Sequence, residues 1–125
     1  MRRALTLKLP PLPGVTPASK YRNEPTVIDG IRFDSKGEAG LYSMLQLLKA
    51  GREVSYFLRQ VPIALPGSVR YVVDFQVFYR DGRIRYLDYK GAETPMFVLK
   101  KKQVEALYPI RIECIRRVRG RFEGL

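Results

Sequence analysis

The sequence predicts a single α/β domain in which a mixed central sheet is flanked by helices. A chain of 125 residues is long enough for one compact domain and too short for two. Apolar residues recur at helical spacing in some segments and alternate in others, which gives the order helix, three strands, helix, strand. With 46% hydrophobic and 28% charged residues, the composition is that of a globular protein able to bury a core.

The chain divides into an arm, a domain and a tail. Residues 1–19 are rich in proline and carry Arg2, Arg3 and Lys8, so we expect a flexible, basic N-terminal arm. Residues 20–119 hold the patterned segments and form the expected domain. Residues 120–125 follow it as a C-terminal tail.

The first patterned segments are two short extended pieces and a helix. Residues 27–33 are expected to form the extended pieces around a turn at Gly30. The helix begins with Ser35 as its N-cap and Glu38 three residues later, which is the pattern of a capping box, and it runs to about Ala50. Its wide apolar stripe predicts burial against a sheet.

Strands are expected over residues 54–65, 69–79 and 83–90. We expect Pro62 to interrupt the first strand, because proline lacks the N–H that a sheet ladder needs. Asp81-Gly82 is a strong signal for a hairpin between the second strand and the third.

A second helix and a last strand complete the domain. Thr94 and Pro95 are expected at the N-cap and first helical positions. We expect Leu99, Val104 and Leu107 to face the core. The last strand is expected over residues 110–118.

The charge balance limits the classes of function. Lysine and arginine number 23 against 12 acidic residues, so the chain carries +11, which indicates a polyanionic partner and above all nucleic acid. No segment has the basic face and long apolar stripe of a membrane-binding helix. The absence of histidine excludes imidazole catalysis, and the single Cys114 excludes a disulfide framework. We expect a soluble, cytoplasmic protein.

In so basic a chain the acidic residues are the most informative about chemistry. Asp74 and Asp88 each interrupt an apolar strand, where an unpaired carboxylate is costly to bury. A two-residue hairpin loop would place Asp74 opposite Tyr89, with Asp88 on the other face. A three-residue loop ending at Gly82 would instead place Asp74 opposite Asp88, with Lys90 on the same face. We expect this second register.

Two carboxylates at cross-strand distance repel each other unless a cation lies between them, and Mg²⁺ suits such oxygen ligands. Lys90 beside them could orient a water molecule or stabilise charge on a phosphate. The alternative is structural, with Asp88 and Lys90 paired on an exposed strand edge while Asp74 caps a bulge. Glu38 also faces the sheet on helical spacing, but the capping box alone would account for it.

This pattern of acids and lysine resembles the PD-(D/E)XK nuclease superfamily. More closely, residues 20–118 resemble a family of short phage and prophage proteins assigned to that fold, near phage junction-resolving endonucleases. The residues that carry the closer resemblance are Lys20-Tyr21, Ile28-Asp29-Gly30-Ile31, residues 33–39, Gln60, residues 71–75, Asp88-Tyr89-Lys90-Gly91, Thr94-Pro95 and residues 99–102.

The resemblance implies a restriction-endonuclease-like αβββαβ core and Mg²⁺-dependent hydrolysis of DNA phosphodiester bonds, with Mn²⁺ able to substitute. The metal ligands that it implies are Glu38, Asp74, Asp88 and the backbone carbonyl of Tyr89. It implies Lys90 as the catalytic lysine. Gln60 matches a polar position that many members place beside the metal site, although a buried strand-end amide fits it nearly as well.

Basic residues on several elements are expected to contact nucleic acid. They are Lys36, Lys100, Lys101, Lys102, Arg116 and Arg117. Phosphate contacts of this kind give affinity and salt dependence but no base specificity. Since no motif for base readout is visible, we expect recognition of branched or junction DNA by its shape.

Several alternatives stay open at this point. The sequence does not separate DNA from RNA as the substrate, and junction resolution would need two active sites and hence a homodimer. The alternative function is that of a non-catalytic phage accessory protein that keeps the nuclease fold and binds nucleic acid or a host factor.

Overall fold

The computed structural model describes residues 25–125. Its elements are β1 (Thr26–Ile28), β2 (Ile31–Phe33), α1 (Lys36–Ala50), β3 (Val54–Leu65), β4 (Val69–Tyr79), β5 (Ile84–Tyr89), α2 (Pro95–Leu107), β6 (Ile112–Val118) and β7 (Arg121–Glu123). The α/β class and the order helix, three strands, helix, strand are therefore confirmed. The expected arm of residues 1–19 and the Lys20-Tyr21 pair lie outside the described residues.

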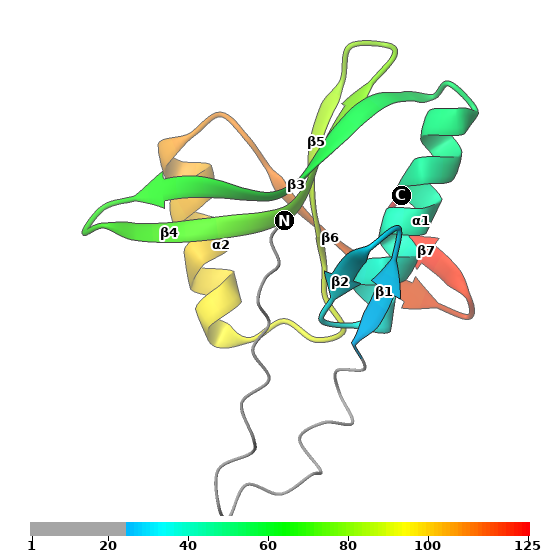
Figure 1. Cartoon of the computed structure of the whole chain (residues 1–125). Helices are drawn as coiled ribbons and strands as arrows, with labels where there is room; N and C mark the ends of the chain where they lie inside the picture. The colour runs from blue at the N-terminus through cyan, green and yellow to red at the C-terminus, as the bar shows by residue number, and fades with distance from the viewer. Residues whose placement is uncertain (1–24) are drawn as a thin grey trace, which may run out of the picture.

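The central sheet is mixed, as expected. Its strand order is β3-β4-β5-β6-β7, and β1 and β2 form a separate hairpin. The β3–β4 and β4–β5 pairs are antiparallel, whereas β5 and β6 are parallel. A parallel pair needs a crossover connection, which α2 supplies. Figure 1 shows α1 and α2 on opposite sides of this sheet.

Each helix covers its own hydrophobic core. Leu41 and Leu45 of α1 pack in one core with Phe75, Val77 and Leu87 of the sheet, and all five are buried. A second core joins α2 to the outer half of the β3–β4 hairpin, and its members include Val73, Phe97, Val104 and Ile112. The candidate site described below lies where the sheet passes from one core to the other.

The β3–β4 hairpin bends between these two cores. Val73 and Phe75 share one face of β4 by strand alternation, yet Val73 belongs to the α2 core and Phe75 to the α1 core. Figure 1 shows both strands turning near the centre of the molecule. The expected interruption at Pro62 is wrong, because β3 runs through it and pairs Pro62 with Val72. Within the strand, Gln60 has a φ of +51°. Pro62 is tolerated because β3 is an edge strand.

The helix boundaries are largely those that the caps predict. Ser35 is the N-cap of α1, where its Oγ accepts a bond from the Glu38 N–H at 3.1 Å. Thr94 caps α2 in the same way by accepting from the Phe97 N–H at 3.1 Å, with proline at the start of the helix.

The predicted core face of α2 is partly wrong. Leu99 and Leu107 are 52% and 53% exposed, whereas Phe97 and Val104 are buried. Phe97 and Val104 lie seven residues apart, close to two helical turns, so they share one stripe, and Leu99 and Leu107 lie on a different one. The short helix carries apolar residues on both stripes, and only the stripe with Phe97 and Val104 packs against the sheet.

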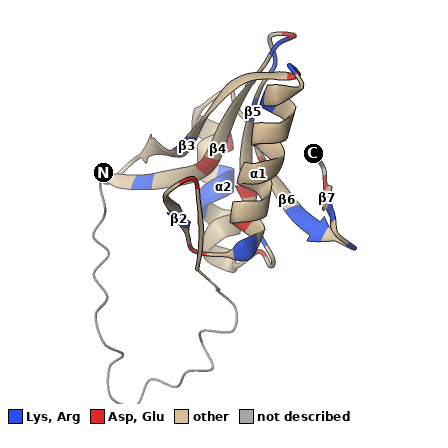
Figure 2. Ribbon diagram, turned by 45° about the vertical axis from the view of Figure 1, so that its right-hand side comes forward, with Lys and Arg blue, Asp and Glu red and all other residues tan. Residues whose placement is uncertain are grey.

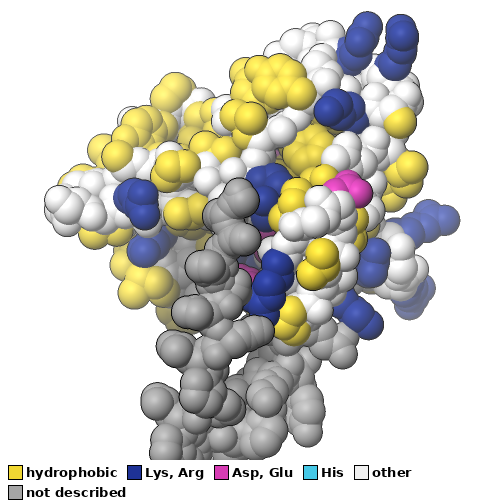
Figure 3. All heavy atoms as spheres, in the orientation of Figure 1, with side chains coloured by type: hydrophobic (Ala, Val, Ile, Leu, Met, Phe, Trp, Pro, Cys, Tyr) yellow, Lys and Arg dark blue, Asp and Glu magenta, His cyan; other side chains and the backbone are white. Residues whose placement is uncertain are grey.

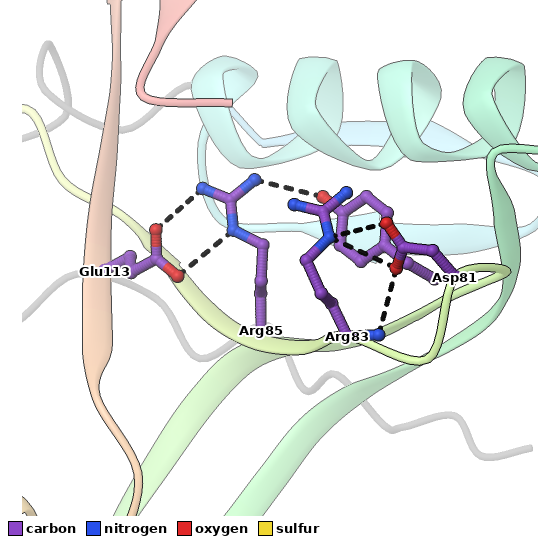
Figure 4. A network of polar contacts seen from close by, with 5 residues as sticks. Asp81, Arg83, Arg85 and Glu113 are labelled. Carbon is purple, nitrogen blue, oxygen red and sulfur yellow. Dashed lines mark hydrogen bonds and ion pairs between the residues drawn. The ribbon is translucent and has the colours of Figure 1, made fainter.

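The C-terminal residues form part of the sheet and not a separate tail. Strand β7 pairs antiparallel with β6. Arg85 ties this end to the rest of the sheet, because its Nη2 donates to Glu113 Oε1 at 2.7 Å and to the Gly124 carbonyl at 2.6 Å. Its Nη1 donates to the Tyr79 hydroxyl at 3.1 Å (Figure 4). Neither helix of the described part has the length and apolar character needed to cross a membrane.

Gly37 marks a close approach between α1 and β5. A Cβ at this position would lie 2.0 Å from the ring of Tyr89, too close for both to remain in place. We expect Gly37→Ala to lower the free energy of unfolding by about 1–3 kcal/mol, as overpacking does, despite the better helix propensity of alanine. Urea unfolding would measure this loss.

The matched control is Gly91→Ala, because a Cβ at Gly91 would meet no atom within 4 Å. If Gly37→Ala unfolded at the same urea concentration as Gly91→Ala, the tight packing of Tyr89 on α1 would be disproved.

Candidate active site

The β4–β5 hairpin has the register that brings the two strand aspartates together. Regular pairs run from Phe78 with Ile84 to Phe75 with Leu87, and one further step places Asp74 opposite Asp88. The loop has three residues, since the Tyr79 N–H donates to the Arg83 carbonyl at 2.9 Å and Gly82 has a φ of +95°. The expected three-residue register is confirmed.

The two aspartates replace the backbone ladder where regular pairing stops. The Asp74 N–H donates to Asp88 Oδ1 at 2.8 Å, and the Tyr89 N–H donates to Asp74 Oδ2 at 2.9 Å. Each carboxylate thus satisfies a backbone donor of the opposing segment. Asp88 is only 1% exposed, so the alternative of an exposed edge pair with Lys90 is wrong.

Glu38 of α1 supplies a third carboxylate. Gln60 Nε2 donates to Glu38 Oε2 at 3.2 Å and to Asp74 Oδ1 at 3.3 Å, so one amide bridges the helix and the sheet. Figure 2 shows the acidic segments of α1, β4 and β5 gathered at the centre of the molecule. The capping box therefore accounts for the Glu38 N–H but not for the direction of its carboxylate.

Burial raises the pKa of all three carboxylates, and neighbouring acids add to the rise at Glu38. Burial, followed by the neighbouring Asp74 charge, raises the pKa of Glu38 to about 7. Burial raises the pKa of Asp88 to about 6, against the opposing effects of the Asp74 N–H and the Lys90 charge. Burial also raises the pKa of Asp74. The site holds more negative charge than its own environment stabilises, and a cation would relieve that excess.

Lys90 lies at the end of β5 beside two of these acids. Its backbone N–H donates to the Ile115 carbonyl at 3.0 Å, so β6 and not β4 aligns it. The ammonium group lies 4.7 Å from the centre of the Phe97 ring on α2. Its charge opposes the rise in the pKa of both Asp74 and Asp88. The lysine therefore faces the acidic cluster from the α2 side.

The donor set fits a hard divalent cation such as Mg²⁺. Asp88 Oδ2 is buried and has no hydrogen-bond partner among the described residues, which is costly for a carboxylate oxygen. As the side chains stand, no group of three acidic or cysteine residues in the described part is arranged to hold a metal ion. The Gln60 amide lies between two of the carboxylates, so it would have to withdraw for them to share one ion. A role for the Tyr89 carbonyl stays a prediction.

The expected nucleic-acid contacts on α2 and β6 are spread over different surfaces. Lys101 pairs with Glu105 at 3.1 Å, while Lys102 is exposed and Lys100 is half-buried. Arg116 pairs with Glu93 at 3.7 Å, and the neighbouring Arg117 lies 4.7 Å from the centre of the Phe122 ring.

Lys36 is exposed at the start of α1, close to Glu38 in sequence. Figure 3 shows lysine and arginine side chains above and below a small acidic area near the centre of one face. The predicted residues do not form one continuous strip, and their contacts with nucleic acid stay predictions.

Arg59 belongs to this site and was not singled out from the sequence. Its guanidinium carbon lies 4.6 Å from the centre of the Phe33 ring, and its charge opposes the rise in the pKa of Glu38 and of Asp74. Strand alternation assigns residues 59 and 60 to opposite faces of β3, so the pattern conceals that both lie near the acids. The one available signal was an arginine directly before a candidate site residue.

Comparison with protein families places this site in a known group of sequences. Residues 18–119 match a family described as "Protein of unknown function (DUF1064)". The chain belongs to the DUF1064 family. The matched residues include all three acids, Gln60 and Lys90, so the whole cluster lies within the family's region. No curated protein and no solved structure matches the chain.

The raised pKa values predict how stability depends on pH in this DUF1064 protein. Glu38 and Asp88 bind protons more tightly folded than unfolded, so the stability that they contribute is lost as pH rises through about 6 to 7. In chelator, we expect the melting temperature to fall between about pH 4 and 7, the range between the unfolded and folded pKa values of these two acids. Added Mg²⁺ should raise it more at the higher pH, which calorimetry would measure. A Mg²⁺ effect independent of pH would contradict this linkage.

Neutralising one buried acid should separate stability from metal binding. Asp88→Asn keeps an oxygen to accept the Asp74 N–H but removes the buried charge. At about pH 8 in chelator, we expect this variant to melt higher than the wild type and to lose the Mg²⁺-induced shift. The exposed Glu53→Gln is the matched control and should keep the wild-type shift. A normal Mg²⁺ shift in Asp88→Asn would remove Asp88 from the candidate ligands.

Proposed function

We propose that this DUF1064 protein is a Mg²⁺-dependent endodeoxyribonuclease that hydrolyses phosphodiester bonds. One observation carries the proposal, namely that carboxylates from α1, β4 and β5 meet beside a lysine that directly follows β5. Glu38, Asp74, Asp88 and Lys90 come from different elements, and the fold brings them together. The αβββαβ order of these elements agrees with the restriction-endonuclease-like core that the resemblance implies.

The residues have separate roles in this proposal. Glu38, Asp74 and Asp88 would hold the ion, and the chemistry that bound Mg²⁺ supplies is polarisation of the scissile phosphate. Lys90 would orient the attacking water molecule or stabilise the charge that develops on the phosphate. Gln60 would hold Glu38 and Asp74 in place before the ion binds, since its amide bonds to both. Mn²⁺ should substitute for Mg²⁺, because the donors are oxygens.

The proposed substrate is DNA, recognised by shape at a branch or junction. The charge of +11 supports a polyanion and gives affinity without base specificity. RNA is the competing substrate, and cleavage of a junction at both strands would require a homodimer. A nuclease of this kind would act in the cytoplasm, that of the host cell if a phage encodes the chain.

A second candidate function is nucleic-acid or host-factor binding without turnover. The observation that favours it is the Gln60 amide, which occupies the space between Glu38 and Asp74 and bonds to both. In that case the buried acids would be a structural cluster bridged by hydrogen bonds. This alternative predicts salt-sensitive DNA binding that neither Mg²⁺ nor Lys90 affects.

The deciding experiment is a Mg²⁺-dependent cleavage assay with the wild type and Lys90→Ala. Four-way junction, flap, linear duplex and single-stranded DNA would be compared, with the matching RNA substrates alongside. We expect Lys90→Ala to lower the cleavage rate by at least about a hundredfold, as loss of a charge-stabilising or proton-transferring group does. DNA binding should change little.

The matched control is Lys49→Ala, an exposed lysine in the last turn of α1 and outside the cluster. It should cleave like the wild type. No cleavage of any substrate by the wild type, with tight DNA binding retained, would favour the second candidate function.

A further inference from the structure

Arg59 and Gln60 both reach the acidic cluster although they are consecutive residues of one strand. In a regular strand their side chains would point to opposite faces of the sheet. Gln60 has a φ of +51° in the middle of β3, a conformation that is costly for any residue other than glycine. This local reversal lets Gln60 bond to Glu38 and Asp74 while Arg59 lies over the Phe33 ring.

The guanidinium of Arg59 is left with an unused donor. Its Nε is buried and has no hydrogen-bond partner among the described residues. Its ring contact with Phe33, at 4.6 Å, fixes the plane of the group but satisfies no N–H. By contrast, Arg85 and Arg83 of the same sheet are paired with Glu113 and Asp81. A buried donor without a partner is rare in a folded protein, and here it means that no acceptor of the described residues neutralises the guanidinium through this nitrogen.

We propose that Arg59, braced by Phe33, is a binding position for a phosphate of the nucleic-acid backbone next to the acidic cluster. The inference rests on the proposed function for the identity of the polymer. A guanidinium presents a planar fork of donors that matches phosphate oxygens. Lys90 approaches the same acids from the α2 side, over Phe97. Arg59 would therefore hold the backbone on the Phe33 side of the cluster, opposite the catalytic position proposed for Lys90.

A phosphate fits this position better than a protein carboxylate does. The chain already carries +11, so a polyanion is the partner that its overall field attracts. Arg59 also lies close enough to Glu38 and Asp74 for its charge to oppose the rise in their pKa. Its half-buried side chain forms none of the ion pairs found among the described residues, so neither acid holds the guanidinium in place of a phosphate.

The first test measures the salt dependence of DNA binding in chelator, where no cleavage occurs. Each phosphate contact contributes about 0.9 to the slope of log affinity against log salt for duplex DNA. We expect Arg59→Met to weaken binding about three- to tenfold and to lower this slope by about one. Arg59→Lys should keep the slope but lose part of the affinity, because an ammonium cannot form the fork.

The matched control is Arg80→Met, an exposed arginine in the β4–β5 loop and remote from the cluster. It should bind with the wild-type slope. If Arg59→Met were folded by circular dichroism and bound DNA with the wild-type affinity and slope, the phosphate position would be refuted. A purely structural role for Arg59 would lower the melting temperature without changing the slope.

A second pair of variants tests whether the backbone at Gln60 places Arg59. Gln60→Gly adopts a positive φ without strain, whereas Gln60→Val strongly disfavours it. We expect Gln60→Gly to keep the wild-type salt slope and Gln60→Val to lose about as much of it as Arg59→Met does. Equal losses in both variants would show that the amide, and not the backbone conformation, places the arginine.

These measurements separate the inference from the proposed function. A wild type that cleaves nothing, together with a reduced slope in Arg59→Met, would refute the nuclease and leave the phosphate position standing. A wild type that cleaves DNA, together with an unchanged slope in Arg59→Met, would refute the phosphate position and leave the nuclease standing.

Discussion

The exchange of hydrogen bonds between Asp74 and Asp88 is the constraint on which the rest of the site depends. Regular pairing of β4 with β5 ends at Phe75 and Leu87, and the two carboxylates then take over the backbone donors on either side. This lets β4 leave the sheet and bend towards α2 while β5 continues in parallel with β6. The same two carboxylates that join the strands are the candidate metal ligands, and the Oδ2 of Asp88 is still without a partner among the described residues.

This arrangement lowers the stability of the fold at the site, and interactions in other parts of the molecule compensate for the loss. Gln60 holds a left-handed conformation in mid-strand, Asp88 Oδ2 has no partner among the described residues, and burial raises the pKa of the acids. Two separate hydrophobic cores and the Arg85 bonds that tie β6 and the C-terminal residues to β5 offset that cost. The other non-glycine residues of the described part with a positive φ lie in turns, and only Gln60 has one within a strand. Strain of this kind beside buried acids is typical of a functional site.

Signals from neighbouring residues made the hairpin register and the starts of the helices predictable from the sequence. The register of the hairpin follows from a three-residue loop closed by a left-handed Gly82, and Ser35 and Thr94 mark where the helices begin. The conformation of Gln60 leaves no such signature, because the surrounding packing imposes it on a residue that does not favour it. The short β7 was missed for a related reason, since it exists only through its pairing with β6.

The chain is strongly basic, yet its candidate site is a cluster of acids with two cations beside it. A net charge of +11 would draw the proposed nucleic acid to the surface, yet Glu38, Asp74 and Asp88 would repel its phosphates at contact. Lys90 and Arg59 lie beside these acids, on the faces of Phe97 and Phe33, and place positive charge between the acids and an approaching strand. In the proposed function, the overall charge would attract the nucleic acid from a distance, while Lys90 and Arg59 would let its phosphates approach the acids. We therefore expect binding and turnover to be separable by mutation.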